Sequence, residues 1–318
     1  MKILLTGGSG LIGSALYPLL CEKGYDVKCA LRRRSDNDVI RDEDIFYYNG
    51  LGSNADWSMI LNDIDVVVHL AAQVPMAGDN SYDKFFEINF KGTETLAIQA
   101  VRAKVKRFIF ISSIGIYGTS DSEISLNENN RENPDNNYSL SKQMAEHALC
   151  AIGNQTGMEI IILRLPLVYG PHVKANFLKL LDYVYKGIPL PFAGVKNKRN
   201  FIALDNVLQA IHACIVNEKA GNEIFIISDY EYISTNDLIQ KISFAMGKPP
   251  RLFRLPQSLA KLFLTIIGRK DLYNKLWGSL RVDSKKIRDK IGWVPTTSID
   301  EGIKITVDWY LSEKNIKK

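Results

Sequence analysis

The sequence has few of the residues that build metal centres or disulfide frameworks. Its 318 residues include only 4 cysteines and 4 histidines. Cys21, Cys29, Cys150 and Cys214 stand singly, without the paired spacing of a zinc or redox site, and the histidines show no ligand spacing either. We therefore expect reduced thiols and no metal ion.

Long hydrophobic runs and a strong net charge are also missing. The most apolar runs, Ile64 to Ala72 and Ile160 to Tyr169, fall short of the roughly 18 residues that a membrane span needs. The formal net charge is +5, in small basic groups, so we expect no nucleic-acid partner and no integral membrane segment. The chain begins directly with Lys2-Ile3-Leu4-Leu5-Thr6, without a signal-peptide pattern, and we expect a cytoplasmic protein.

Short β-branched runs alternate with amphipathic helical patterns up to about residue 165. The predicted strands are Ile3-Thr6, Asp26-Arg32, Ile45-Tyr48, Asp65-Leu70, Arg107-Ser112 and Glu159-Leu165. The predicted helices are Leu11-Lys23, Trp57-Leu61, Tyr82-Val101 and Tyr138-Asn154. This alternation predicts an α/β fold with a Rossmann-type, doubly wound parallel sheet over residues 1–165.

In residues 166–318 the regular alternation of strands and helices ends, and the predicted segments are shorter and separated by frequent prolines. Helices are predicted at Ala175-Lys186, Asp205-Asn217, Ser234-Met246, Gln257-Ile267 and Ile299-Leu311. We expect a smaller C-terminal α/β lobe that closes a cleft over the strand ends, with some crossing of the chain between the lobes. The apolar side of the helix from Leu259 to Ile267 predicts a core or dimer face, in preference to a membrane or partner contact.

The first strand leads directly into Thr6-Gly7-Gly8-Ser9-Gly10-Leu11-Ile12-Gly13. Glycine at positions 7, 10 and 13 permits a sharp turn, close approach of a pyrophosphate and tight helix-sheet contact. The second strand ends in Arg32 instead of an acidic residue that would hold a ribose 2′-hydroxyl. Because arginine pairs well with a 2′-phosphate, we favour NADP over NAD, and NAD stays open.

Tyr138 and Lys142 are four residues apart on a predicted helix, after a strand that ends in Ser112-Ser113. We interpret Tyr138 as the acid/base, Lys142 as the group that lowers its pKa, and Ser113 as the residue that orients a carbonyl oxygen. A second Tyr-x-x-x-Lys pair, Tyr310 and Lys314, has no such strand or serine beside it, and we interpret it as solvated surface.

The whole chain resembles the extended short-chain dehydrogenase/reductase family, in particular its nucleotide-sugar epimerases, dehydratases and 4-keto-reductases. The motifs that carry the resemblance are the glycine motif, His69-Leu70-Ala71-Ala72, Asn89-Phe90-Lys91-Gly92-Thr93, Ser112-Ser113, Tyr138-x-x-x-Lys142 and Arg164-Leu165-Pro166-Leu167-Val168-Tyr169-Gly170-Pro171. The C-terminal lobe is similar to bacterial enzymes that reduce UDP-4-keto-6-deoxy-N-acetylhexosamines for surface polysaccharide synthesis.

The resemblance also implies site residues and an assembly. It assigns cofactor contacts to Gly7, Gly10, Leu11, Ile12, Gly13, Arg32, Leu51, Leu70, Ala71, Ala72, Asn89, Tyr138, Lys142 and Leu165. It assigns contacts with a UDP-sugar to Ser113, Asn176, Phe192, Arg199 and Arg281. It further implies a homodimer formed through the helices at 82–101 and 138–154.

Two positions depart from the family pattern. Asn49-Gly50-Leu51 stands where the family often has Gly-Asp-Leu, so Gly50 replaces the aspartate and backbone alone is expected to meet the adenine. Leu167 replaces an asparagine that helps many epimerases hold the nucleotide sugar.

These observations leave four hypotheses. The leading one is an NAD(P)-dependent 4-keto-reductase of a UDP-4-keto-6-deoxy-N-acetylhexosamine. A 4-epimerase of UDP-glucose or UDP-N-acetylglucosamine with tightly bound NAD uses the same residues. Reduction of a small carbonyl compound leaves Asn176 and Arg199 without a role, and a binding module without catalysis has no need of Ser113, Tyr138 and Lys142 together.

Overall fold

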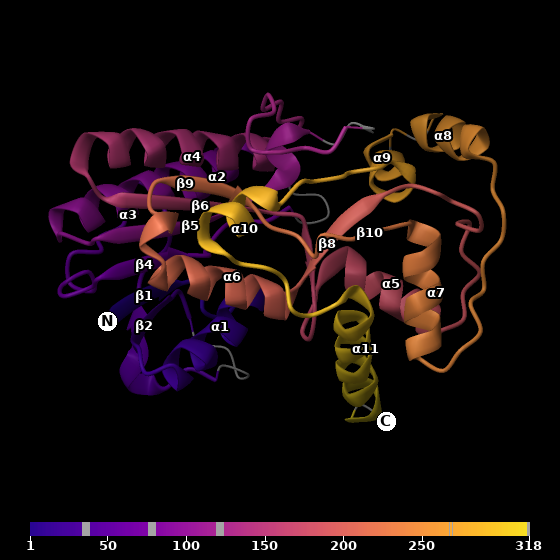
Figure 1. Cartoon of the computed structure of the whole chain (residues 1–318), viewed down its shortest axis with the longest axis horizontal. Coiled ribbons are helices and arrows are strands. Elements are labelled where there is room, and N and C mark those ends of the chain that lie inside the picture. Colours follow the sequence, from indigo (N-terminus) through magenta and orange to yellow (C-terminus); the bar gives the residue numbers. More distant parts are fainter. Residues whose placement is uncertain (34–38, 76–80, 119–123, 267, 269, 317–318) are drawn as a thin grey trace.

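A seven-stranded parallel sheet forms the larger part of the chain in the computed structural model, which describes residues 1–33, 39–75, 81–118, 124–266, 268 and 270–316 (Figure 1). The strand order is β3-β2-β1-β4-β5-β6-β9. The strands are β1 (Lys2–Thr6), β2 (Asp26–Leu31), β3 (Ile45–Tyr47), β4 (Val66–His69), β5 (Arg107–Ser113), β6 (Glu159–Leu165) and β9 (Glu223–Ile226). This order confirms the predicted Rossmann-type fold.

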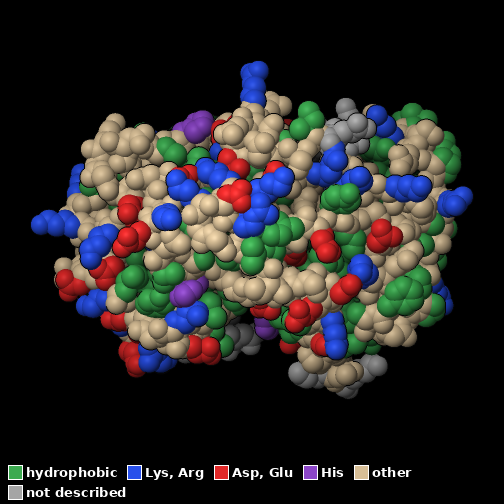
Figure 2. Space-filling view, in the orientation of Figure 1, with side chains coloured by type: hydrophobic (Ala, Val, Ile, Leu, Met, Phe, Trp, Pro, Cys, Tyr) green, Lys and Arg blue, Asp and Glu red, His purple; other side chains and the backbone are tan. Residues whose placement is uncertain are grey.

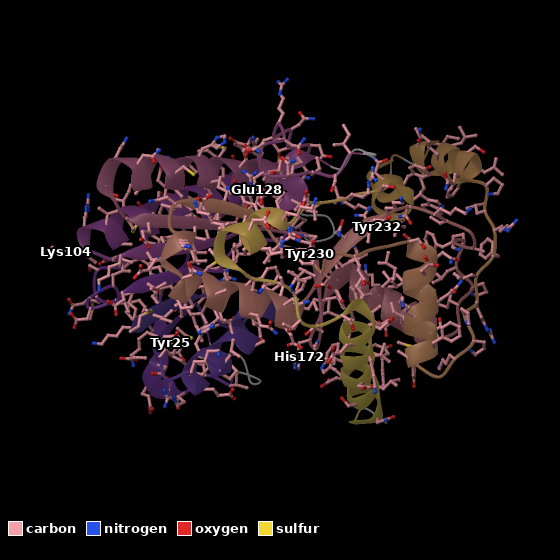
Figure 3. The ribbon with its side chains drawn as sticks, in the orientation of Figure 1. Tyr25, Lys104, Glu128, His172, Tyr230 and Tyr232 are labelled. Atoms are coloured by element: carbon pink, nitrogen blue, oxygen red, sulfur yellow. The ribbon has the colours of Figure 1, made fainter. Side chains whose placement is uncertain are left out.

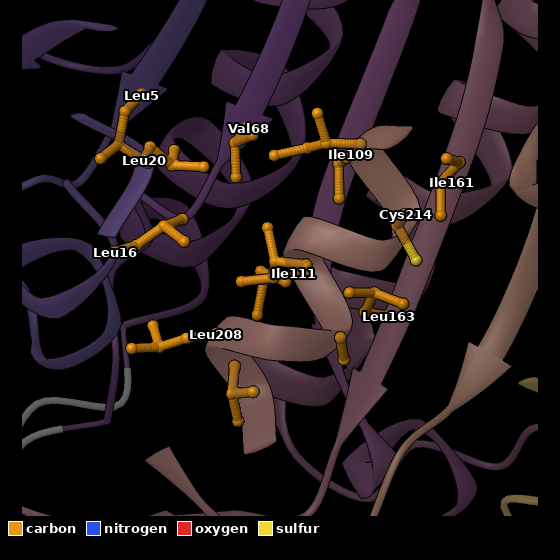
Figure 4. Packing of buried hydrophobic residues seen from close by; sticks show 14 of the residues in the cluster. Leu5, Leu16, Leu20, Val68, Ile109, Ile111, Ile161, Leu163, Leu208 and Cys214 are labelled. Carbon is orange, nitrogen blue, oxygen red and sulfur yellow. The ribbon is translucent and has the colours of Figure 1, made fainter. Parts of the chain in front are cut away.

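Two helical layers cover this sheet. Alternate residues along each strand face opposite layers: Ile109 and Ile111 of β5 pack toward α1 (Leu11–Glu22) and α6 (Leu204–Val216), as Figure 4 shows. Phe108 and Phe110 pack toward α3 (Gly92–Arg102) and α4 (Asn137–Thr156). Burial on both faces explains why these strands are continuous apolar runs in the sequence.

The smaller lobe is built on a three-stranded sheet, β10-β8-β7, with its own hydrophobic core. Its strands are β7 (Leu167–Tyr169), β8 (Arg199–Ala203) and β10 (Tyr232–Ile233). Its helices are α5 (Ala175–Tyr185), α7 (Thr235–Ala245), α8 (Gln257–Ile266), α9 (Lys270–Trp277) and α11 (Ile299–Ile316). None of the helices in the described residues is long and apolar enough to cross a membrane.

The chain passes between the two sheets more than once. After β8, α6 returns to the large sheet, β9 adds a strand beside β6, and α10 (Lys285–Ile291) packs beside β9. The loop after β5 is tied to the same edge, because Glu128, labelled in Figure 3, accepts a hydrogen bond of 2.7 Å from the Ile226 N–H. The carboxyl ends of the parallel strands are thereby brought beside the small lobe.

Several segments differ from the sequence predictions. The predicted helix Trp57-Leu61 is a series of turns, held by a bond from the Trp57 N–H to the Gln99 side chain and by packing of the Trp57 ring on Tyr48. The predicted helix Tyr82-Val101 is divided into α2 (Tyr82–Phe85), a π-helical segment η2 (Phe86–Lys91) and α3. Helices α9 and α10 were not predicted, since segments this short carry little periodicity.

Candidate active site

The glycine motif forms a tight turn between β1 and α1. Gly7 has φ +75°, and a Cβ on it would lie 2.7 Å from the Ala71 N; a Cβ on Gly13 would lie 2.2 Å from the Gly7 O. Helix α1 begins after Gly10, with no side-chain cap and no acidic residue in its first turn. The N–H groups of the first turn of α1 thus have no side-chain cap among the described residues, which fits the binding of a pyrophosphate.

A chain of buried hydrogen bonds links the glycine turn to the end of β4. The Ala71 N–H donates to Thr6 Oγ1 (3.3 Å), which is 2.7 Å from His69 Nδ1. His69 Nε2 is 3.0 Å from Thr93 Oγ1, whose hydroxyl donates to the Asn89 carbonyl (2.6 Å). Burial lowers the pKa of His69 to about 3, so the imidazole is neutral and donates from Nε2.

Asn89 connects this chain of bonds to the helix that carries Tyr138. Its side-chain oxygen accepts the Gln73 N–H (2.7 Å), and its amide donates to Ser141 Oγ (3.0 Å). Asn89 lies in the π-helical segment η2, a feature that often marks functional sites. The loop after β4, with Leu70, Ala71 and Ala72 half-buried along it, is therefore fixed against α4.

Tyr138 and Ser113 come from adjoining elements at the sheet's carboxyl edge. Tyr138 is in the first turn of α4, where Asn136 caps the helix by accepting the Ser139 N–H (2.9 Å), and its ring meets Phe85 edge-on at 6.0 Å. Ser113 ends β5, and its hydroxyl accepts the Gly115 N–H (3.0 Å). A Cβ at Gly115 would lie 3.2 Å from Ser113 Oγ and 2.6 Å from Ser139 Oγ, so β5 and α4 meet closely there.

Lys142 forms a hydrogen bond with the backbone in this structure, and its predicted effect on the pKa of Tyr138 stays a prediction. Its ammonium donates to the Ile111 carbonyl (2.7 Å) and lies 4.3 Å from the centre of the Phe110 ring. Burial lowers the pKa of Lys142 to about 7, partly opposed by Glu146. In the protein alone, burial raises the pKa of Tyr138 to about 12. The phenol is therefore protonated near neutral pH.

Below Lys142, a buried ionic network that the sequence analysis did not identify joins α4 to β6. Arg164 is 2% exposed and donates to both oxygens of Glu146, which is 1% exposed, and to Glu132 and the Tyr117 hydroxyl. Glu146 is one helical turn beyond Lys142, so the spacing Tyr138, Lys142, Glu146 places all three on one face of α4. An arginine within an apolar strand was the signal in the sequence, since buried charges need partners.

A pocket of about 440 Å³ opens beside the loop after β3. Its lining includes Tyr48, Leu51 and Glu87, whose carboxylate accepts bonds of 2.7 Å from the Ser53 N–H and hydroxyl. Arg32 is exposed at the end of β2, close enough to Tyr48 to oppose the raised pKa that burial gives this phenol. The structure thus places Leu51 in the lining of this pocket and Arg32 near Tyr48, another lining residue.

The predicted substrate residues lie in or beside the small lobe. Arg199 on β8 is bridged to Leu280, so Arg281 follows immediately beside it. Arg199 donates to the Asn274 and Gly278 carbonyls, whereas the Nε of Arg281 is buried without a hydrogen-bond partner among the described residues. Asn176 is exposed in the first turn of α5, and Phe192 is 6% exposed and packs on Trp277, with ring centres 4.6 Å apart. A buried guanidinium Nε without a partner among the described residues is the feature that points most clearly to an anionic ligand.

A comparison with known protein families agrees with the geometry of this site. The glycine turn, the neutral His69 and the group of Ser113, Tyr138 and Lys142 are what a dinucleotide-dependent enzyme needs. Residues 3–228 match the model of the NAD dependent epimerase/dehydratase family. The chain belongs to this family. A curated UDP-glucose 4-epimerase of Vibrio cholerae is 36% identical over 99% of this chain and 97% of its own length. The predicted extended short-chain dehydrogenase/reductase and its nicotinamide dinucleotide are thereby confirmed.

Solved structures show the same fold as this epimerase/dehydratase family member. UDP-glucuronic acid 4-epimerase from Bacillus cereus in complex with NAD matches with a TM-score of 0.80 at 24% identity, covering 100% of both chains. UDP-glucose 4-epimerase from Thermotoga maritima with UDP-glucose matches with a TM-score of 0.78 at 23% identity, covering 99% of this chain and 100% of that one.

Proposed function

We propose that the protein is an NAD(P)H-dependent 4-keto-reductase that acts on a UDP-4-keto-6-deoxy-N-acetylhexosamine in surface polysaccharide synthesis. The observation that carries this proposal is the protonated Tyr138 at the start of α4, adjoining Ser113 at the end of β5. A reduction at C4 consumes a proton at the new hydroxyl, and a phenol whose pKa is about 12 is already in the form that supplies it.

Each residue of the group has a separate task in this proposal. Ser113 orients the C4 carbonyl oxygen, and Tyr138 protonates it. Lys142 turns from the Ile111 carbonyl to the cofactor ribose, and its protonated form stabilises the phenolate that is left when Tyr138 has given its proton to the C4 oxygen. A bound reduced dinucleotide supplies the hydride to C4.

The dinucleotide is proposed to run from the glycine turn to the pocket at Leu51. The N–H groups at the start of α1 hold its pyrophosphate, and backbone of residues 49–51 meets its adenine. Arg32, near Tyr48, supports NADPH, because it offers a guanidinium where an acidic residue would select NADH. Because the chain matches an NAD-dependent family, NADH is tested beside NADPH.

The lobe at residues 166–318 is proposed to hold the UDP group. Arg281 has a buried Nε with no partner among the described residues, and Arg199 lies next to it across the bridge to Leu280. Two adjoining guanidinium groups suit a diphosphate. Asn176 is exposed on α5, and Phe192 is buried against Trp277. We therefore place both residues at the rim of this site.

A UDP-glucose or UDP-N-acetylglucosamine 4-epimerase is the second candidate. It is favoured by the 36% identity to the Vibrio cholerae UDP-glucose 4-epimerase over nearly the whole chain. Such an enzyme starts by removing the proton from a C4 hydroxyl, which requires the tyrosine to be ionised. Leu167, 43% exposed in place of the family's asparagine, and the high pKa of Tyr138 favour the reductase instead.

The proposal is tested with purified protein, UDP-4-keto-6-deoxy-N-acetylglucosamine and added NADPH or NADH, by following nicotinamide absorbance and the sugar product. Stoichiometric cofactor consumption with formation of a 6-deoxy sugar supports the reductase. Interconversion of UDP-glucose or UDP-N-acetylglucosamine with its C4 epimer, without net cofactor consumption, identifies the epimerase. A homodimer through α3 and α4 and a cytoplasmic location complete the proposal.

A further inference from the structure

Helix α8 is apolar on two sides, and only one of them is covered. Ala260 and Leu264 are buried in the core of the small lobe. The outward residues Leu259, Leu262, Phe263 and Ile266 are 55%, 58%, 63% and 74% exposed. Their spacing places them on one stripe of the helix, so the predicted core face accounts for the inner side alone. We call these four residues the α8 stripe.

The chain around the α8 stripe is basic and free of acidic residues. Residues 238–270 contain seven lysines and arginines and no aspartate or glutamate, whereas the other 285 residues have more acidic than basic side chains. Lys241 and Lys248 are occupied by Asp300 and by the Tyr185 carbonyl and ring. Arg251, Arg254 and Lys261 are exposed and form no ion pair among the described residues.

These features lie together at one corner of the molecule. Figure 1 places α8 at the outer end of the small lobe, and Figure 2 shows hydrophobic side chains gathered at that corner with lysines and arginines beside them. A second copy of the chain would bring an equally basic surface to the α8 stripe, so self-association there is opposed by repulsion between like charges. The charge instead complements an anionic partner.

We propose that α8 docks on a bilayer surface that contains anionic phospholipid. An apolar helical stripe flanked by lysine and arginine is the pattern of helices that lie in the membrane interface. Leu259, Leu262, Phe263 and Ile266 enter the boundary between headgroups and acyl chains. Arg251, Arg254 and Lys261 are drawn to the negative surface potential, an attraction that salt weakens.

The test is sedimentation of the full chain with vesicles of phosphatidylcholine alone or mixed with phosphatidylglycerol. We expect about tenfold stronger binding to the mixed vesicles, lost at high salt. Leu262→Gln combined with Phe263→Gln lowers this binding about tenfold, and Lys261→Glu combined with Arg254→Glu abolishes the preference for anionic lipid. The matched control is Phe244→Gln, because Phe244 is 67% exposed on α7, away from α8, and this variant binds as the wild type does.

Three results overturn the proposal. The wild type stays in solution with mixed vesicles at low salt, or Phe244→Gln loses as much binding as the α8 variant, or the wild type forms a dimer that the Leu262 and Phe263 substitutions dissociate. The last result means that a second copy covers the α8 stripe. Circular dichroism of each variant separates a loss of binding from a loss of fold.

Discussion

Glu146→Gln tests the buried ionic network beneath the active-site helix. The substitution keeps the size of the side chain but removes the carboxylate that accepts three hydrogen bonds from Arg164, whose side chain is 2% exposed. Breaking a buried ion pair by removing one partner costs about 3–5 kcal/mol, because the other charge is left uncompensated. Glu132 and the Tyr117 hydroxyl still contact Arg164, so we expect a loss of about 3 kcal/mol, the lower end of that range.

Urea denaturation followed by circular dichroism measures this loss. Glu43→Gln is the matched control: its pair with Arg41 spans 3.7 Å between side chains that are 72% and 59% exposed, and such surface pairs contribute about 0–1 kcal/mol. The double variant Glu146→Met and Arg164→Met removes both charges and should recover most of the stability. A Glu146→Gln protein as stable as Glu43→Gln would refute the reasoning.

Four further predictions concern the site. Tyr138→Phe keeps dinucleotide binding, measured by fluorescence titration, and loses turnover at least about a hundredfold, since the proton donor is gone; retained turnover contradicts its role. Gly13→Ala abolishes dinucleotide binding, because the new Cβ meets the Gly7 O at 2.2 Å. Gly24→Ala is strained by its φ of +81° but has nothing within 4 Å of its new Cβ and lies outside the turn, so it leaves binding intact; equal binding by both variants contradicts the assignment of the turn. Burial lowers the pKa of Lys142 to about 7. Between pH 7 and the ordinary lysine pKa, the folded state therefore binds fewer protons than the unfolded state. The free-energy cost of burying Lys142 is greatest below pH 7, where the lysine is protonated in both states. Relative to Lys142→Met, wild-type unfolding free energy should therefore rise between pH 7 and 10, and a flat difference contradicts a buried, neutral lysine. Arg281→Met weakens binding of UDP by about tenfold or more in calorimetry without lowering the melting temperature, as its Nε has no partner among the described residues to lose; unchanged UDP affinity places the diphosphate elsewhere.

The strands of the large sheet up to residue 165 could be predicted from sequence because the central ones are buried on both faces, whereas β9 (Glu223–Ile226) was not predicted. Each predicted strand agrees with the structure within two residues, as β5 at Arg107–Ser113 shows. The segment at Trp57 could not be predicted, since its turns depend on Gln99 and Tyr48, which are distant in sequence. Local periodicity does not contain such contacts.

The candidate site was predictable to the extent that short motifs define it. The glycine turn and the spacing of Tyr138 and Lys142 are readable from residue types alone. The pKa directions of these two groups were not, because they depend on burial by elements far apart in the chain. The π-helical segment that places Asn89 against Gln73 and Ser141 has no sequence pattern of its own.

Transfer of label from NADPH or NADH deuterated at the nicotinamide C4 tests the central claim most directly. The protein is incubated with UDP-4-keto-6-deoxy-N-acetylglucosamine, and the product is examined by mass spectrometry and NMR. The account predicts one deuterium at C4 of the sugar for each cofactor oxidised, in the wild type and not in Tyr138→Phe. An unlabelled sugar, with UDP-glucose or UDP-N-acetylglucosamine epimerised by dinucleotide that stays bound, would contradict it.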